Sequence, residues 1–96
     1  MKNLVWSANF VGAVKKVIRR NPALKESVER ALRYLAEDPS HPTLHSHKLK
    51  GELAGIWACT VDYDNRILFE FVRNQDTGED EIFLSAIGSQ LTFFAR

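Results

Sequence analysis

The chain has 96 residues, of which 45% are hydrophobic and 26% are charged. This length favours a single domain over residues 1–96 with one modest core, and the composition is that of a globular protein. No apolar run is long enough to span a membrane, and the N-terminus lacks the pattern of a signal peptide. The single cysteine, Cys59, cannot form an internal disulfide, so we expect a cytoplasmic protein.

The net charge of +1 conceals an uneven distribution along the chain. Residues 1–50 hold ten Lys or Arg and four Asp or Glu, whereas residues 51–96 hold three Lys or Arg and eight Asp or Glu. A basic first half can attract an anion such as nucleic acid. The alternative is that the two halves attract each other across the fold, and the sequence leaves both open.

The first forty residues are predicted to form a short strand and a helical hairpin. Residues 3–6 are apolar and of strand length, and Ser7 is a suitable N-cap for a helix that runs to residue 20. A second helix is expected to start at Asn21 as cap and Pro22 as first residue, and to end before Pro39. Both helices carry one apolar stripe: Phe10, Val11, Val14, Val17 and Ile18 in the first, and Leu24, Val28, Ala31, Leu32 and Leu35 in the second.

The rest of the chain changes to a strand pattern. Residues 55–61, 66–72 and 81–87 are β-branched and aromatic runs of strand length. A turn at residues 62–65 and a polar loop at residues 73–80 connect them, and links this short favour an antiparallel meander. Helices followed by strands indicate the α+β class, with the hairpin on one sheet face and the other face partly open.

A metal site is the first chemistry to weigh, because His41, His45 and His47 are close together and Cys59 could join them. Structural zinc sites bring paired Cys or His from two segments, and here one of the two pairs is missing. We therefore expect no metal. Cys59 lies in the middle of a predicted strand, where a buried structural thiol is expected in place of a nucleophile.

The stretch "HSHKLKG", residues 45–51, also offers the groups needed for RNA cleavage without a metal. A histidine can transfer protons near neutral pH, Lys and Arg can hold a phosphate, and an aromatic ring can stack a base. His47, Lys48, Lys50 and Arg66 supply the first two kinds, and the C-terminal phenylalanines the third. The competing interpretation is a surface histidine and phenylalanines that belong to the core.

The order of elements, with "HKLKG", "GIWACTVDYDNRILFEF" and "IFLSAIGSQLTFF", resembles the RelE/ParE superfamily of type II toxins over nearly the whole chain. The YafQ-like and RelE/StbE-type mRNA interferases are the most similar branch. The resemblance implies a RelE-like fold, in which an N-terminal helical hairpin packs on a small antiparallel β-sheet. It also implies a toxin that cuts mRNA on the ribosome without metal or cofactor, by attack of the 2′-hydroxyl and with a cyclic phosphate product. A cognate antitoxin is implied as partner in a toxin–antitoxin hetero-oligomer.

The same resemblance implies roles for particular residues. Each is carried over from the position that it matches in the motifs, with the two lysines and the glutamine assigned to substrate binding on chemical grounds. The implied catalytic residues are His47, Asp64, Arg66 and Phe94, and the implied substrate-binding residues are Lys48, Lys50 and Gln90.

Two positions depart from the pattern of the family. Thr60 stands where the YafQ-like branch carries a second histidine, and Gln90 stands where a histidine or arginine is usual. Loss of one general acid or base typically costs about 10²–10⁴-fold in rate, so a weak nuclease is implied. A ParE-like inhibitor of gyrase, or a degenerate toxin that acts only through protein binding, remains the alternative.

Overall fold

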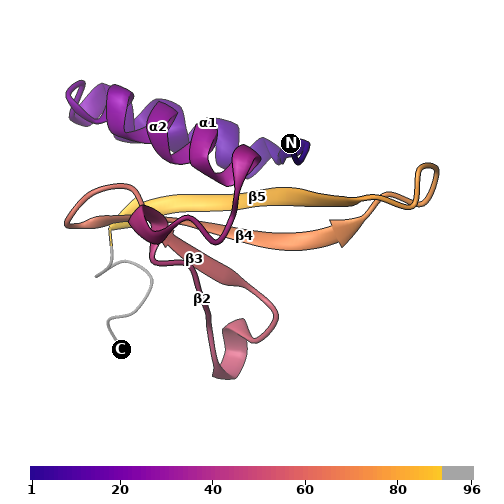
Figure 1. Ribbon diagram of the computed structural model, residues 1–96. Helices are drawn as coiled ribbons and strands as arrows, with labels where there is room; N and C mark the ends of the chain where they lie inside the picture. The colour runs from indigo at the N-terminus through magenta and orange to yellow at the C-terminus, as the bar shows by residue number, and fades with distance from the viewer. Residues whose placement is uncertain (90–96) are drawn as a thin grey trace.

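The computed structural model describes residues 1–89, which form two helices against a five-stranded sheet (Figure 1). Short 3₁₀ turns, η1 at Pro42–Leu44 and η2 at Gly51–Leu53, flank the second strand. The helices are α1 at Ala8–Arg20 and α2 at Leu24–Glu37, and the strands are β1 at Leu4–Trp6, β2 at His47–Lys48, β3 at Trp57–Thr60, β4 at Asn65–Arg73 and β5 at Asp80–Ser89.

The strands lie in the order β1-β5-β4-β3-β2. Strands β2 to β5 form an antiparallel meander, which confirms the prediction for the second half of the chain. Strand β1 differs from the prediction of an antiparallel sheet, because it pairs parallel to β5. The helical hairpin carries the chain across the sheet after β1, and a crossover of this kind permits parallel pairing. The α+β class with a RelE-like arrangement is confirmed.

Helix α1 starts as predicted. The Ser7 hydroxyl accepts a hydrogen bond from the Phe10 N–H at 3.0 Å, which satisfies one of the free donors of the first turn. Arg19 and Arg20 lie in the last turn, where a positive charge is favourable next to the exposed carbonyl groups. Phe10 and Val14 are the buried residues of its inner face.

Helix α2 starts two residues later than predicted. Asn21 does not cap α2 with its side chain. It ends α1, where its N–H donates to the Val17 carbonyl at 3.0 Å, and its own carbonyl accepts from Leu24 N–H at 3.0 Å. Pro22 therefore lies in the turn between the helices. The helix ends at Glu37, before Pro39, as predicted.

The main core lies between the helices and the sheet, the two layers that Figure 1 shows from the side. Side chains alternate along β4, so Ile67 and Phe69 face the helices while Leu68 faces the opposite side. On that opposite side a smaller cluster forms around Leu49, Ala58 and Leu68. One face of the sheet is therefore covered by the helices, and the other is covered only in part by chain from the β2–β3 region.

A bulge in β5 fixes α1 to the sheet. Leu68 pairs with Ala86 and Phe69 with Leu84, which leaves Ser85 as an extra residue on β5. Its backbone carbonyl accepts a hydrogen bond from the Asn9 side-chain amide at 2.8 Å. The start of α1 is thereby held against β5.

Within residues 1–89, no helix is both long and apolar enough to cross a bilayer.

Phe69 tests the core, because its side chain is fully buried between sheet and helices. Phe69→Ala should lower the free energy of unfolding by about 3–5 kcal/mol through the cavity it leaves. Tyr63→Ala, at a side chain that is 96% exposed, should change it by about 0.5 kcal/mol or less. Urea denaturation followed by circular dichroism measures both, and equal losses would contradict this assignment of the core.

Candidate functional site

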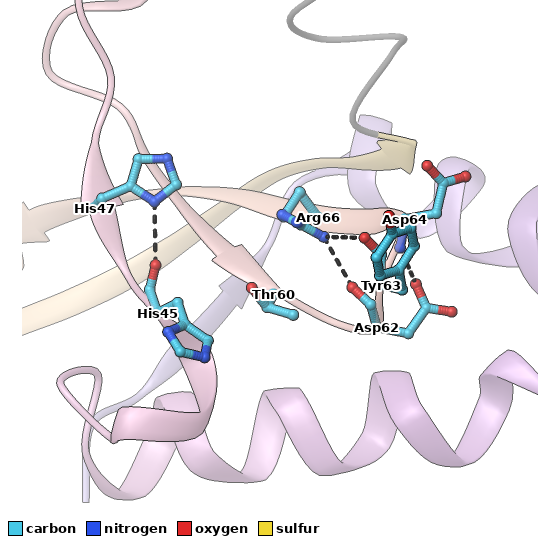
Figure 2. A pocket seen from close by; sticks show the side chains of 7 residues that line it. All are labelled: His45, His47, Thr60, Asp62, Tyr63, Asp64 and Arg66. Atoms are coloured by element: carbon cyan, nitrogen blue, oxygen red, sulfur yellow. Dashed lines mark hydrogen bonds between the residues drawn. The ribbon is translucent and has the colours of Figure 1, made fainter.

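A pocket of about 520 Å³ opens on the sheet face away from the helices, beside the turn that joins β3 to β4. Figure 2 shows it between the β2 edge on one side and this turn on the other. A volume of this size is ordinary for a small-molecule or nucleotide site. Its lining residues are His45, His47, Thr60, Asp62, Tyr63, Asp64 and Arg66.

Strand register decides which side chains reach this pocket. Thr60 pairs with Arg66 across β3 and β4, so both side chains lie on one sheet face. His47 pairs with Ala58, two residues before Thr60, and so lies on that face as well. Three neighbouring strands thus each contribute one polar side chain to the same surface.

The turn between β3 and β4 is held by Asp62. Its carboxylate accepts hydrogen bonds from the Asn65 N–H at 2.8 Å, the Asp64 N–H at 3.0 Å and the Asn65 side-chain amide at 3.1 Å. Partial burial raises the pKa of this carboxyl. The hydrogen bonds and the nearby Arg66 charge outweigh burial, and the net pKa lies below the ordinary value of 3.8. Asp62 is therefore a charged structural element of the site.

Arg66 is anchored to the same turn. Its Nη1 donates to the backbone carbonyls of Asp62 at 2.8 Å, Asn65 at 3.0 Å and Tyr63 at 3.3 Å. These bonds orient a guanidinium that is always charged. The turn thus fixes one positive charge in the wall of the pocket (Figure 2).

His47 stands across the pocket from Arg66, and its ring has a defined hydrogen bond. Its Nδ1 lies 3.1 Å from the backbone carbonyl oxygen of His45. A carbonyl only accepts, so Nδ1 must carry the hydrogen, and the neutral ring keeps its lone pair on Nε2. That nitrogen is the proton acceptor that a general base requires.

The structure brings together three of the residues implied by the family resemblance: His47, Asp64 and Arg66. It places Lys48 elsewhere, because Lys48 pairs with Trp57 and its Nζ lies 5.7 Å from the centre of that ring, on the helix side of the sheet. Lys50 is exposed and does not line the pocket.

Gln90 and Phe94 lie outside the described residues.

Sequence reasoning missed Asp62 and Tyr63, and it considered His45 only as a metal ligand. The sequence signal for Asp62 and Tyr63 is the turn at residues 62–65, which reads "DYDN". An Asp two residues before another Asp and three before Asn is typical of a side chain that caps its own turn. Tyr63 sits at the tip of that turn with its ring in solvent.

Cys59 is fully buried on the core side of β3, as predicted. Burial raises its pKa from 9.0 to about 12, against smaller lowering effects of a hydrogen bond with the Ile67 backbone and the Arg66 charge. The thiol is therefore protonated and inert at neutral pH. Among residues 1–89, no three His, Cys, Asp or Glu side chains are grouped so as to hold a metal ion.

No protein-family model matches the chain, and no curated protein sequence matches it. Solved structures of toxins do match it. YafQ from E. coli has a TM-score of 0.77 and 14% identity, over 99% of this chain and 100% of YafQ. A YoeB/ParE toxin from Agrobacterium tumefaciens has a TM-score of 0.73 and 19% identity, over 94% of this chain and 99% of that toxin. A metal-bound toxin from Helicobacter pylori has a TM-score of 0.73 and 22% identity, over 98% of this chain and 100% of that toxin. The chain therefore has the RelE/ParE-like toxin fold, as the sequence resemblance implied.

Asp62 makes a pH-dependent contribution to stability. Because its pKa is lower in the folded protein than in the unfolded chain, the folded state binds fewer protons near that pKa. The contribution is complete above pH 3.8 and is lost as the pH falls below it. Asp62→Asn should therefore unfold more easily at neutral pH and lose less further stability on acidification. Free energies of unfolding measured across this range check both, and parallel pH profiles would contradict the assignment.

Cys59 should resist alkylation while the protein is folded. At about pH 8, where an ordinary exposed cysteine reacts readily, iodoacetamide should leave the native chain unmodified. The same chain in denaturant should be labelled once, as mass spectrometry would show. Rapid labelling of the native protein would contradict the buried position.

Proposed function

We propose that this chain is the toxin of a type II toxin–antitoxin pair and that it cleaves mRNA on the ribosome. The observation that carries the proposal is that His47, whose hydrogen-bonded Nδ1 leaves Nε2 as proton acceptor, and the fixed charge of Arg66 line one pocket on a toxin-type fold. General base and phosphate-binding charge are the two groups that metal-independent RNA cleavage needs first. One of the similar solved structures is the E. coli DinJ–YafQ toxin–antitoxin complex, which supports an antitoxin as partner.

In the proposed reaction, His47 Nε2 takes the proton of a ribose 2′-hydroxyl. The 2′-oxygen attacks the adjacent phosphorus, a new P–O2′ bond forms, and the P–O5′ bond breaks. The products are a 2′,3′-cyclic phosphate and a free 5′-hydroxyl. Arg66 stabilises the negative charge that builds on the phosphate oxygens, which electrostatic preorganisation makes effective because the turn already holds the guanidinium.

The departing 5′-oxygen must receive a proton. Thr60 cannot act as an acid near neutral pH. His45 lines the same pocket beside Thr60, and a protonated imidazole can donate. We assign the acid role to His45, which would compensate for the threonine at position 60. Asp64, together with the exposed ring of Tyr63, can bind the ribose and base on the other side (Figure 2).

Partner binding is proposed on charge. Helix α1 carries Lys15, Lys16, Arg19 and Arg20 and has no acidic residue. An acidic segment of an antitoxin would complement this surface, and the resulting hetero-oligomer would be sensitive to salt.

His47→Ala and Arg66→Ala should each lower the rate of mRNA cleavage by about 10²–10⁴-fold. The measurement is primer extension on an mRNA in a translating extract, where the wild type should give cuts in register with codons. His45→Ala should also slow cleavage, because the departing 5′-oxygen would lose its proposed proton donor.

Arg73→Ala is the matched control, because Arg73 lies on the same strand as Arg66 but seven residues along, roughly 23 Å away. It pairs with Asp80 at 3.6 Å, outside the pocket, and its loss should leave cleavage unchanged. Cuts that persist in His47→Ala would remove the base role. Absence of cuts by the wild type, with inhibition of gyrase supercoiling, would favour the ParE-like alternative that Thr60 keeps open.

A further inference from the structure

We infer that a second pocket, on the other side of the β2 edge from the candidate site, binds an unpaired nucleobase of the RNA substrate. The inference rests on the proposed function and extends it from the cleaved bond to a neighbouring nucleotide. This second pocket has a volume of about 450 Å³. It is lined by Pro39, Ser40, His41, Pro42, His45, Ser46, Trp57 and Phe71.

The aromatic side chains of this pocket are suited to stacking. Trp57 and Phe71 meet edge to face, with ring centres 5.4 Å apart, and Trp57 is backed by Phe69 at 6.4 Å. Phe71 is 40% exposed, although Phe69, two residues before it on the helix side of β4, is fully buried. The exposed Phe71 ring can offer a π-face to a base in this hollow, and such stacking does not depend on base identity.

His41 supplies a polar group at a fixed orientation. Its ring stacks on Tyr34, with centroids 4.0 Å apart and planes 10° from parallel. The Thr43 N–H donates to His41 Nδ1 at 3.1 Å, so the neutral ring carries its hydrogen on Nε2. Stacking on Tyr34 and the hydrogen bond at Nδ1 together hold the His41 ring in place. The Nε2–H of this ring can then donate to an acceptor on the edge of a base.

The two pockets share one wall. His45 lines both of them, and β2, at the edge of the sheet, separates them. His47 and Lys48 follow each other on β2 and therefore face opposite sides. His47 lines the first pocket, and the Lys48 ammonium lies 5.7 Å from the ring centre of Trp57, which lines the second. A strand of RNA with its cleaved bond at His47 can thus cross the sheet edge, with Lys48 near its phosphate and the Phe71 ring beneath the next base.

An apolar side chain of the antitoxin is the competing occupant. The chemistry of the lining favours RNA. Among residues 1–89, two histidines and two serines line the second pocket and no acidic residue does. The Lys48 ammonium lies 5.7 Å from the Trp57 ring centre. A flat ring joined to a negative phosphate matches this combination better than an aliphatic side chain does.

The test uses a Trp6→Phe background, in which Trp57 is the only tryptophan and reports binding by its fluorescence. The probe is a short single-stranded RNA with 2′-O-methyl groups, which cannot be cleaved, and an abasic site is moved along it one position at a time. We expect one position at which the missing base weakens binding about 5- to 150-fold. Phe71→Ala should weaken binding of the intact RNA similarly, and the two losses should not add.

Phe71→Leu keeps the apolar volume and removes the π-face, so it repeats the test if the alanine variant fails to fold. Phe83→Ala is the control, because Phe83 is a half-buried aromatic on the other face of the sheet, next to Glu70 across the β4–β5 pair. It should leave the affinity unchanged.

Unchanged RNA affinity in folded Phe71→Leu would overturn the inference. So would a result in which the losses caused by the Phe71 substitution and by the abasic site add at every position of the abasic site along the RNA. Weakened binding of the antitoxin alone would overturn it in favour of a protein-docking pocket. The proposed function is judged separately, by primer extension with the wild type. Codon-registered cuts together with unchanged affinity in Phe71→Leu would leave the nuclease standing and remove only the base-binding pocket.

Discussion

The register between β3 and β4 is the constraint on which the rest of this molecule depends, and the Asp62 carboxylate holds it. Three hydrogen bonds to that carboxylate close the turn, and Thr60 then pairs with Arg66. A slip of one residue would exchange the two faces of β4, moving Arg66 toward the core and Ile67 toward solvent. Burial of the core and assembly of the pocket are therefore consequences of the same turn, and neither can be changed independently of the other.

The same alternation gives the short strand β2 two different surfaces. His47 faces the open side and lines the first pocket, whereas Lys48 faces the helix side and lies over the ring of Trp57, which lines the second pocket. An edge strand of two residues is easily bordered by loops, and here those loops, at residues 38–46 and 61–64, supply most of the remaining lining. The polar surface is built on connections held by rigid neighbours, which is where binding residues usually occur.

The spacing of apolar residues along the chain, and the prolines that end helices, made most of the fold predictable. The stripes of the two helices, the Ser7 cap and the three long strands follow from local pattern. The parallel pairing of β1 was not predictable, because it depends on a partner near residue 83 that no local pattern identifies. The start of α2 was misplaced because Asn21 completes α1 through its backbone, and this removes it as a side-chain cap. In the site, His47, Asp64 and Arg66 came from motif positions, but Lys48 was expected beside them. Sequence proximity suggested one surface, whereas a strand sends successive residues to opposite faces.

The backbone conformation of His45 supports the function proposed for the first pocket. Its backbone is left-handed, with φ of 46° and ψ of 43°, a conformation that is uncommon for residues other than glycine. In a regular strand His45 and His47 would share one face, and His45 could not line the second pocket. The left-handed turn after Pro42–Leu44 breaks that alternation and lets one imidazole border both cavities while its carbonyl fixes the tautomer of His47. Glycine or asparagine would form this turn more easily, yet neither has a side chain that can carry a proton near neutral pH. The left-handed turn thus places His45 in the same pocket as Thr60, and the acid role proposed for His45 rests on this placement.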